Sequence, residues 1–197
     1  MITTEQIKEL RDRTGISVMQ CKKALEDAGG DQEKALAFLK KKGAEVADKK
    51  AERTLGAGVV RAYIHANGTV GAMVELLTET DFVARNEEFS VLAYDIAMHV
   101  AAMKPEFLDE TQISEEAKAQ AKALFAEEVE KMQKPEDIKA KVMEGKLATY
   151  FGEKTLLAQS FVKNPEHTIA DLVKNATQKF GEKIAVARFA RFSVLGK

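Results

Sequence analysis

The chain has few of the residues on which redox, metal and membrane chemistry depend. Its 197 residues include one cysteine, three histidines and no tryptophan. A single cysteine cannot form an intramolecular disulfide or a cysteine-rich zinc site, and it is typical of a reducing compartment. No run of about 18 apolar residues is present, which argues against a membrane-spanning helix. The beginning, MITTEQIKEL, lacks the regions of a secretory signal. We therefore expect a soluble, cytoplasmic protein without a membrane partner.

Charge of one sign is not in excess either. The 30 Lys and Arg residues stand against 31 Asp and Glu residues, which leaves a net charge of −1. Proteins that bind nucleic acid through its phosphates usually carry a clear basic excess, so we expect no nucleic-acid partner. Hydrophobic residues make up 45% of the chain. This is enough for a packed core and too much for a disordered chain.

The motifs of common enzyme classes are missing as well. No GxxxxGK[ST] segment occurs, so we expect no direct nucleotide binding through a P-loop. Gly56–Gly58 begins a dinucleotide-binding pattern, but Arg61 stands where its third glycine is required. The histidines His65, His99 and His167 lack the HExxH spacing of a zinc site. We expect no catalytic residue, no cofactor and no metal site, and therefore no enzyme.

The first 53 residues predict a three-helix module followed by a tether. Helix starts are expected at Thr3, Ser17 and Asp31, because their side-chain oxygens can accept hydrogen bonds from free backbone N–H groups. Each helix should be about ten residues long. The lysine-rich stretch 40–53 is then expected to be a helical or flexible tether. Apolar residues at helical spacing should face the module's core; they are Val18, Cys21, Leu25, Ala28, Ala35, Phe38 and Leu39.

A β-hairpin is expected to open the core, which we place at residues 54–197. Asn67-Gly68 is typical of a type I′ turn because both residues accept positive φ angles. Apolar residues alternate along both flanking segments, as in strands with one buried face. The residues expected to face inward are Val60, Ala62, Ile64, Val70, Ala72, Val74 and Leu76.

Helices are expected to follow the hairpin. Apolar spacing predicts long helices over 89–100 and 113–132, then a shorter segment after Pro135 and a further helix after Thr168. The residues 156–162 are apolar enough for a strand or a buried turn, and the sequence leaves both open.

A strand over 184–195 is expected to close the chain. Its apolar parity changes between Val186 and Phe189, which predicts either a β-bulge or a strand covered on both faces. The order of elements predicts an α+β fold in which helices cover an antiparallel sheet.

The segment Thr80–Asn86 is a candidate interaction site at the junction of strand and helix. Thr80 and Asp81 are good helix-start residues, so they could simply cap the next helix. Phe82 is harder to explain in this way, because a large ring at such a turn is often exposed. An exposed ring beside a carboxylate can insert into a pocket of a partner protein. The residues leave two interpretations open: an interaction wedge, or a cap with a core phenylalanine.

A second candidate lies where the second helix begins. Val18 and Met19 are adjacent, and a helix cannot bury both on one face. With Val18 on the apolar stripe, Met19 is expected to be exposed, which suits an adaptable protein contact. A partly buried edge of the core is the alternative. Cys21 lies on the same stripe with no nearby histidine, so core packing is favoured over a catalytic thiolate.

Four segments of the chain resemble signatures of the bacterial elongation factor Ts family. They are Arg11–Leu25, Thr80–Asn86, Phe161–Pro165 and Arg188–Phe192. They occur in the family's order and span nearly the whole chain. The resemblance implies a ubiquitin-associated-type three-helix module, a tether and an α+β core.

The resemblance also implies a function, namely guanine-nucleotide exchange on elongation factor Tu in protein synthesis. The expected partner is elongation factor Tu in its GDP-bound and nucleotide-free forms. The N-terminal module of the family docks on the partner's G domain. Val18, Met19 and Lys22 match positions of that contact surface.

The family's wedge is matched by Asp81 and Phe82. In the family this wedge enters the G domain beside the magnesium site, and the stretch from Thr80 to Val83 is the one linked to magnesium displacement. Losing the ion's contacts exposes charge on the bound phosphates, so GDP is released faster.

The chain departs from longer members of the family in its length. Those members carry a second core subdomain, a helical hairpin and a C-terminal module, and we expect this chain to have a single core without them. Short members can dimerise to recover the missing contacts, so the resemblance is compatible with a homodimer.

Two other functions compete with this interpretation. An RNA- or ribosome-binding protein would use Lys40–Lys42 and Lys49-Lys50, and its binding would weaken steeply with salt. A small enzyme would use His65 or His99. Neither alternative explains the position of Phe82.

Overall fold

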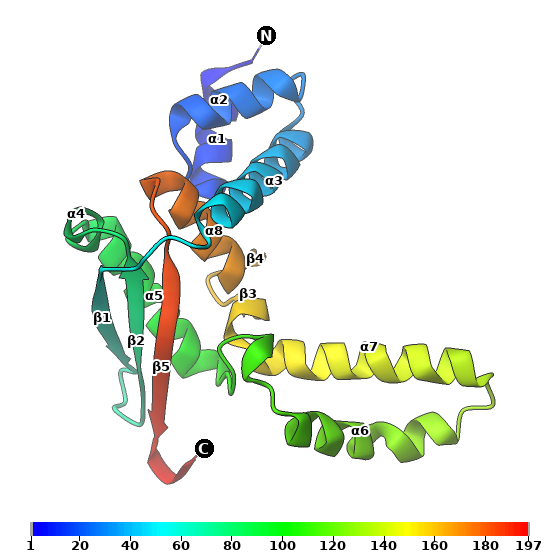
Figure 1. Ribbon diagram of the computed structural model, residues 1–197. Helices are drawn as coiled ribbons and strands as arrows, with labels where there is room; N and C mark the ends of the chain where they lie inside the picture. Colours follow the sequence, from blue (N-terminus) through cyan, green and yellow to red (C-terminus); the bar gives the residue numbers. More distant parts are fainter. Residues whose placement is uncertain (1, 197) are drawn as a thin grey trace. The chain divides into compact units, whose positions relative to one another are not determined.

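The computed structural model describes residues 2–196, apart from the side chain of Leu195, and it shows an α+β chain (Figure 1). The α+β prediction is thus confirmed. The elements form two compact units, one of Met1–Ala101 with Ala170–Lys197 and one of Ala102–Ile169. Among residues 2–196, no helix has the length and apolar character needed to cross a bilayer.

The first unit begins with the three predicted helices, α1 (Thr4–Thr14), α2 (Val18–Asp27) and α3 (Gln32–Lys50). Thr3, Ser17 and Asp31 cap them as expected, each accepting a hydrogen bond from a backbone N–H of the first turn. The helix α3 is 19 residues long, so the expected length of about ten is wrong and most of the tether is helical. Its lysines and alanines are good helix formers, which explains the extension.

The core of this module differs from the prediction at two apolar positions. Val18 and Phe38 are half exposed, whereas Ile16 and Leu36 are buried and contribute to the module's core. Ile16 precedes the Ser17 cap and contacts Cys21, whose thiol donates to the Ile16 carbonyl at 3.6 Å. This is the pattern of a hydrophobic staple, in which the residue before the cap packs on the first full turn. It leaves Val18 outside the core.

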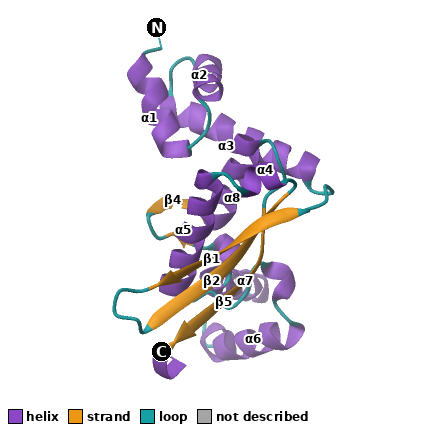
Figure 2. Cartoon of the chain, turned by 90° about the vertical axis from the view of Figure 1, so that its left-hand side faces the viewer, coloured by secondary structure: helices purple, strands orange, loops and turns teal. Residues whose placement is uncertain are grey.

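The sheet of the first unit has the strand order β1 (Ala57–Ile64), β2 (Val70–Thr78) and β5 (Ala185–Ser193), and all pairs are antiparallel. Helices α5 (Glu87–Met103) and α8 (Ile169–Phe180) lie on one side of it (Figure 2). The fully buried ring of Phe89 meets that of Phe180 edge to face, with centroids 6.1 Å apart.

The inward face of β1 is the opposite of the predicted one. Ala62 lies opposite Met73, and Tyr63 lies opposite Ala72, and partners in a pair point to the same side of a sheet. Because Ala72, Val74 and Leu76 are buried, β1 turns Val59, Arg61 and Tyr63 toward the helices. Val60 and Ile64 are exposed on the other face.

The hairpin loop also differs from the expected type I′ turn. Gly68 has a φ of 69°, and no non-glycine residue of the loop has a positive φ. The Asn67 side chain instead accepts hydrogen bonds from the backbone and hydroxyl of Thr69, at 3.1 and 2.8 Å. This Asx-type turn closes the loop with asparagine in an ordinary conformation.

Of the two alternatives predicted for the last strand, the structure shows the bulge, which lies in β5. Arg188 pairs with Glu75 and Val186 pairs with Leu76, which leaves Ala187 as the additional residue between them. The bulge reverses the parity of β5, in agreement with the change seen in its apolar pattern.

The second unit contains the helices α6 (Glu115–Glu130) and α7 (Glu136–Lys154), which form a helical hairpin (Figure 1). Two expectations are therefore wrong: α7 is not a shorter segment, and the chain does carry a helical hairpin. The rings of Phe125 and Tyr150 join the two helices edge to face at 5.7 Å. After α7, a 3-10 turn (Leu156–Ala158) precedes the short strands β3 (Ser160–Phe161) and β4 (Asn164–Thr168).

Candidate functional site

The short helix α4 (Asp81–Ala84) forms an exposed corner directly after β2. The side chain of Phe82 is 87% exposed, the highest value among the large hydrophobic side chains of the described residues. Val83 and Ala84 are buried beneath it. The corner is therefore fixed to the core by its last two residues and presents an aromatic ring outward. The interpretation of Phe82 as a core residue is wrong.

Asp81 lies beside this ring and is also available to a partner. Its carboxylate is 3.7 Å from the guanidinium of Arg85, and both side chains are largely exposed. An exposed ion pair of this kind stabilises a protein by at most about 1 kcal/mol. The Asp81 carboxylate can therefore leave Arg85 for another hydrogen-bond donor at little cost.

Thr80 precedes α4, but its hydroxyl does not cap the helix. It donates instead to the Glu182 carboxylate at 2.6 Å, and the Thr80 backbone N–H donates to the same carboxylate at 3.0 Å. The Thr78 hydroxyl adds a third hydrogen bond at 2.7 Å. Burial disfavours the charged form of Glu182, but the hydrogen bonds from Thr80 and Thr78 outweigh it and hold the pKa of Glu182 below its usual value.

The predicted docking residues share the start of α2. Met19 is 74% and Val18 47% exposed, and Lys22 is half exposed with its ammonium 3.8 Å from the Glu26 carboxylate. The three side chains thus combine two apolar contacts and a cation on accessible surface. The alternative of Met19 as a partly buried edge of the core is wrong, because most of its surface is exposed.

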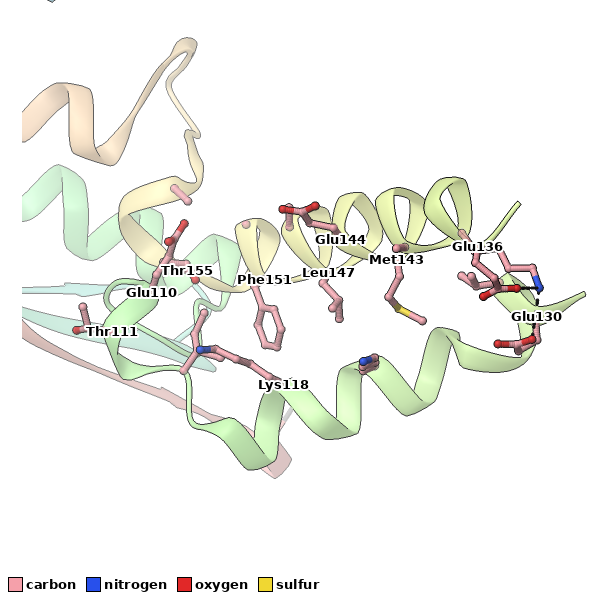
Figure 3. Close-up of a pocket in the computed structure, with 18 residues that line it drawn as sticks. Glu110, Thr111, Lys118, Glu130, Glu136, Met143, Glu144, Leu147, Phe151 and Thr155 are labelled. Atoms are coloured by element: carbon pink, nitrogen blue, oxygen red, sulfur yellow. Dashed lines mark hydrogen bonds and ion pairs between the residues drawn. The ribbon is translucent and has the colours of Figure 1, made fainter. Parts of the chain in front are cut away.

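A groove in the second unit was not indicated by any sequence motif. It lies between α6 and α7 and has a volume of about 900 Å³. Figure 3 shows Met143, Leu147 and Phe151 pointing from α7 into it. At one end, Lys139 forms ion pairs with Glu130 and Glu136 at 3.5 and 2.9 Å. None of the predicted site residues lines this groove.

The chemistry-bearing side chains are dispersed. Within residues 2–196, no three His, Cys, Asp or Glu side chains gather as a metal site requires. His99 is fully buried, and His65 is exposed with its Nδ1 2.9 Å from the Tyr63 hydroxyl. Burial raises the pKa of the Cys21 thiol, although contacts with Thr14 and Arg11 act against it. Cys21 is therefore a buried, protonated thiol, as its place on the apolar stripe predicted.

Comparison with known proteins assigns the chain to a family. The family model described as "Elongation factor TS" matches residues 17–196. The elongation factor Ts of Thermosipho melanesiensis is 46% identical over 194 residues, which covers 98% of this chain and 99% of the relative. That of Thermodesulfovibrio yellowstonii is 47% identical over 193 residues, covering 98% of this chain and 96% of the relative.

The fold and these relatives define a translation elongation factor, with a role in protein biosynthesis. More specifically, the chain belongs to the elongation factor Ts family. The resemblance inferred from the four sequence segments is confirmed.

Sequence reasoning found the exposed corner and the α2 surface but missed Glu182. This residue is 102 positions from Thr80 along the chain, so no local pattern connects them. The one available signal was its position: Glu182 follows Gly181, glycine is common just after the end of a helix, and a carboxylate in such a loop can reach a neighbouring turn.

Proposed function

We propose that this protein is a guanine-nucleotide exchange factor for elongation factor Tu. The observation that carries the proposal is the Phe82 ring, 87% exposed beside the Asp81 carboxylate, on a corner of a chain that belongs to the elongation factor Ts family. A ring this exposed contributes little to the stability of its own chain. It is well suited to fill a pocket of a partner protein.

In this proposal, the residues Thr80–Val83 act on the partner's magnesium site. The Phe82 ring enters the G domain of elongation factor Tu, and Asp81 accepts hydrogen bonds from groups displaced beside it. Val83 is 3% exposed, so it serves as the anchor rather than as a contact. Movement of the partner's groups away from magnesium leaves the phosphate charge of GDP less well compensated, and GDP is released faster.

Docking is assigned to Val18, Met19 and Lys22 on α2. Methionine adapts its shape to a partner surface, and the Lys22 ammonium can pair with a carboxylate there. The module formed by residues 1–53 would hold the protein on the G domain while α4 acts. Met1 itself lies outside the described residues.

The scheme makes and breaks no covalent bond, so it requires neither a catalytic residue nor a cofactor of this chain. It is also consistent with thermodynamic linkage. A factor that weakens GDP binding to elongation factor Tu must itself bind less tightly to the GDP form. Since translation is its setting, we propose that the protein acts in the cytoplasm.

Magnesium dependence provides the experiment for this mechanism. With magnesium present, the protein should accelerate GDP release from elongation factor Tu. With magnesium chelated, spontaneous release should already be fast and the protein should add little. An equal acceleration in both conditions would contradict action through the magnesium site, and GTP hydrolysis by the protein alone would contradict the exchange function.

We also propose that a second copy of this chain covers the open face of the sheet. The face exposes Val60, Ile64, Met73 and Phe192, and a hollow of about 370 Å³ lies at the hairpin end of this face. Clustered exposed apolar side chains of this kind are typical of an interaction surface. The Arg188–Glu75 ion pair, at 2.6 Å, places both charges near the apolar patch, so a two-fold related copy can meet each charge with its opposite.

Ile64→Asp is expected to dissociate this homodimer, because the variant would bury a charge against an apolar face. Sedimentation velocity should show dimers for the native chain and an at least roughly tenfold weaker association for Ile64→Asp. Val91→Asp is the matched control, since Val91 is an exposed residue of α5, outside this face. A native chain that stays monomeric, or two variants with the same effect, would contradict the proposal.

A further inference from the structure

Two turns of the first unit are joined by hydrogen bonds beside the exposed corner. One turn, Gly181–Lys183, connects α8 to β5, and the other, Thr78–Thr80, connects β2 to α4. The Glu182 carboxylate accepts hydrogen bonds from the Thr78 hydroxyl, the Thr80 backbone N–H and the Thr80 hydroxyl, at 2.7, 3.0 and 2.6 Å. The second turn is therefore held from outside by a side chain of the first.

The neighbouring residues of the two turns form the reverse contact. The Glu79 carboxylate accepts a hydrogen bond from the backbone N–H of Lys183 at 2.5 Å. It also pairs with the guanidinium of Arg53 at 3.2 Å. Each turn thus supplies one carboxylate to the other, and the contacts are of the strong, charge-assisted kind.

The same α8–β5 turn also holds the end of the tether. The Lys183 ammonium donates to the carbonyls of Ala51 and Arg53, at 2.5 and 3.0 Å. The Lys50 ammonium donates to the Gly181 carbonyl at 2.6 Å. Of these cations, Arg53 pairs directly with the Glu79 carboxylate, whereas Lys50 and Lys183 bind backbone carbonyls and join the turn to the end of the tether.

The helix α4 depends on such external support. It has only four residues, Asp81–Ala84, and no side-chain cap at its start, and a helix this short is not stable by itself. Its backbone bonds run from Ala84 to the Thr80 carbonyl and from Arg85 to the Asp81 carbonyl, at 3.1 and 3.0 Å. Thr80 thus links the Glu182 carboxylate to the residues that carry the Phe82 ring.

We propose that Glu182 is a positioning residue that holds Thr80, and through it fixes the direction in which Phe82 leaves α4. Lys183 and Lys50 extend the arrangement to the tether, so one turn, Gly181–Lys183, sets both the corner and the end of the docking module. The inference rests on the proposed exchange function, to which it adds a residue that touches no partner. Without Glu182, the Thr80 N–H and hydroxyl lose their acceptor and α4 samples other orientations.

The test is a comparison of Glu182→Ala with the native full-length chain in GDP release from elongation factor Tu. Glu182→Ala should lower the maximal release rate about tenfold, the size expected when a charge-assisted hydrogen bond is lost. The half-saturating concentration should change less than about twofold, because the α2 surface is intact. Glu182→Gln retains one acceptor oxygen, so its maximal release rate should lie between those of the native chain and Glu182→Ala. Glu45→Ala, an exposed glutamate of α3, is the control and should behave as the native chain.

A double-variant cycle separates positioning of the ring from a general structural role. In a Phe82→Ala background, Glu182→Ala should add less than about a twofold further loss, because there is no ring left to position. Independent, additive losses would overturn the proposal, and so would a change confined to the half-saturating concentration.

Amide hydrogen exchange, measured without the partner, tests the positioning role of Glu182 independently of the proposed nucleotide-exchange function. In Glu182→Ala, the amides of Ala84 and Arg85 should exchange at least about tenfold faster, while amides of the α5 core should be unchanged. Unchanged exchange at α4 would overturn the positioning role. If the native chain failed to accelerate GDP release, the proposed nucleotide-exchange function would be wrong. The rates of amide hydrogen exchange in α4 would still decide whether Glu182 holds the corner.

Discussion

Phe82→Ala is expected to slow stimulated GDP release about thirtyfold and to leave the melting temperature nearly unchanged. Filling a partner pocket with a phenyl ring contributes about 2 kcal/mol or more to binding. The same ring contributes little to folding, because 87% of its surface is exposed in the free protein. Stopped-flow release of labelled GDP and thermal melting, measured on the same variant, check both parts of this expectation.

Phe89→Ala is the matched control for this prediction. Phe89 is fully buried and packs on Phe180, so its removal should cost about 3–5 kcal/mol of stability. A large fall in melting temperature for Phe82→Ala, with near-normal exchange by the remaining folded protein, would contradict the wedge. If Phe82→Ala instead bound RNA as well as the native chain does, and this binding weakened steeply with salt, the RNA-binding alternative through Lys40–Lys42 would be favoured.

Removal of residues 1–53 is expected to abolish most of the binding while the rest of the chain stays folded. The sheet and its covering helices begin at β1, and the core cluster of the N-terminal module draws only on residues between 2 and 39. The deletion removes the contacts of Lys50, Ala51 and Arg53 with the turn 181–183, which lie at the surface. It also removes Val18, Met19 and Lys22, so the Kd for elongation factor Tu should rise at least about 100-fold.

Circular dichroism and calorimetric binding measure the two outcomes of this deletion. The remaining chain should melt cooperatively with the strand and helix content expected from residues 54–197. A remainder that is unfolded would show that the module is part of the core rather than separable from it. Unchanged affinity would show that α2 is not the docking surface.

The sequence located the corner as a candidate site because the relevant signals are local, although the residues alone left a core phenylalanine as the alternative to an exposed ring. Asp81 and Phe82 lie between a strand and a helix, and a large ring at such a junction has little core to enter. The bulge in β5 was also predictable, since an additional residue reverses the side on which every later residue points. The caps at Thr3, Ser17 and Asp31 were recognisable from residue type alone.

The features that the sequence did not predict depend on contacts between distant residues or on a choice between similar faces. Val59 and Val60 are both apolar, so the pattern of β1 alone could not decide which one faces the helices. The helix α7 contains Gly145 and Gly152, which weaken its helical signal, and its pairing with α6 stabilises it. The role of Glu182 depends on hydrogen bonds to Thr78 and Thr80, which are 104 and 102 positions away in the sequence.

The most direct test of the account is the release of labelled GDP from elongation factor Tu at saturating concentrations of this protein. With magnesium present, the native chain should accelerate release strongly, and Phe82→Ala should retain roughly one thirtieth of that acceleration. The protein must remain unchanged after many cycles, since it makes no covalent bond. A release rate that is the same with and without the native chain would contradict the proposed exchange function.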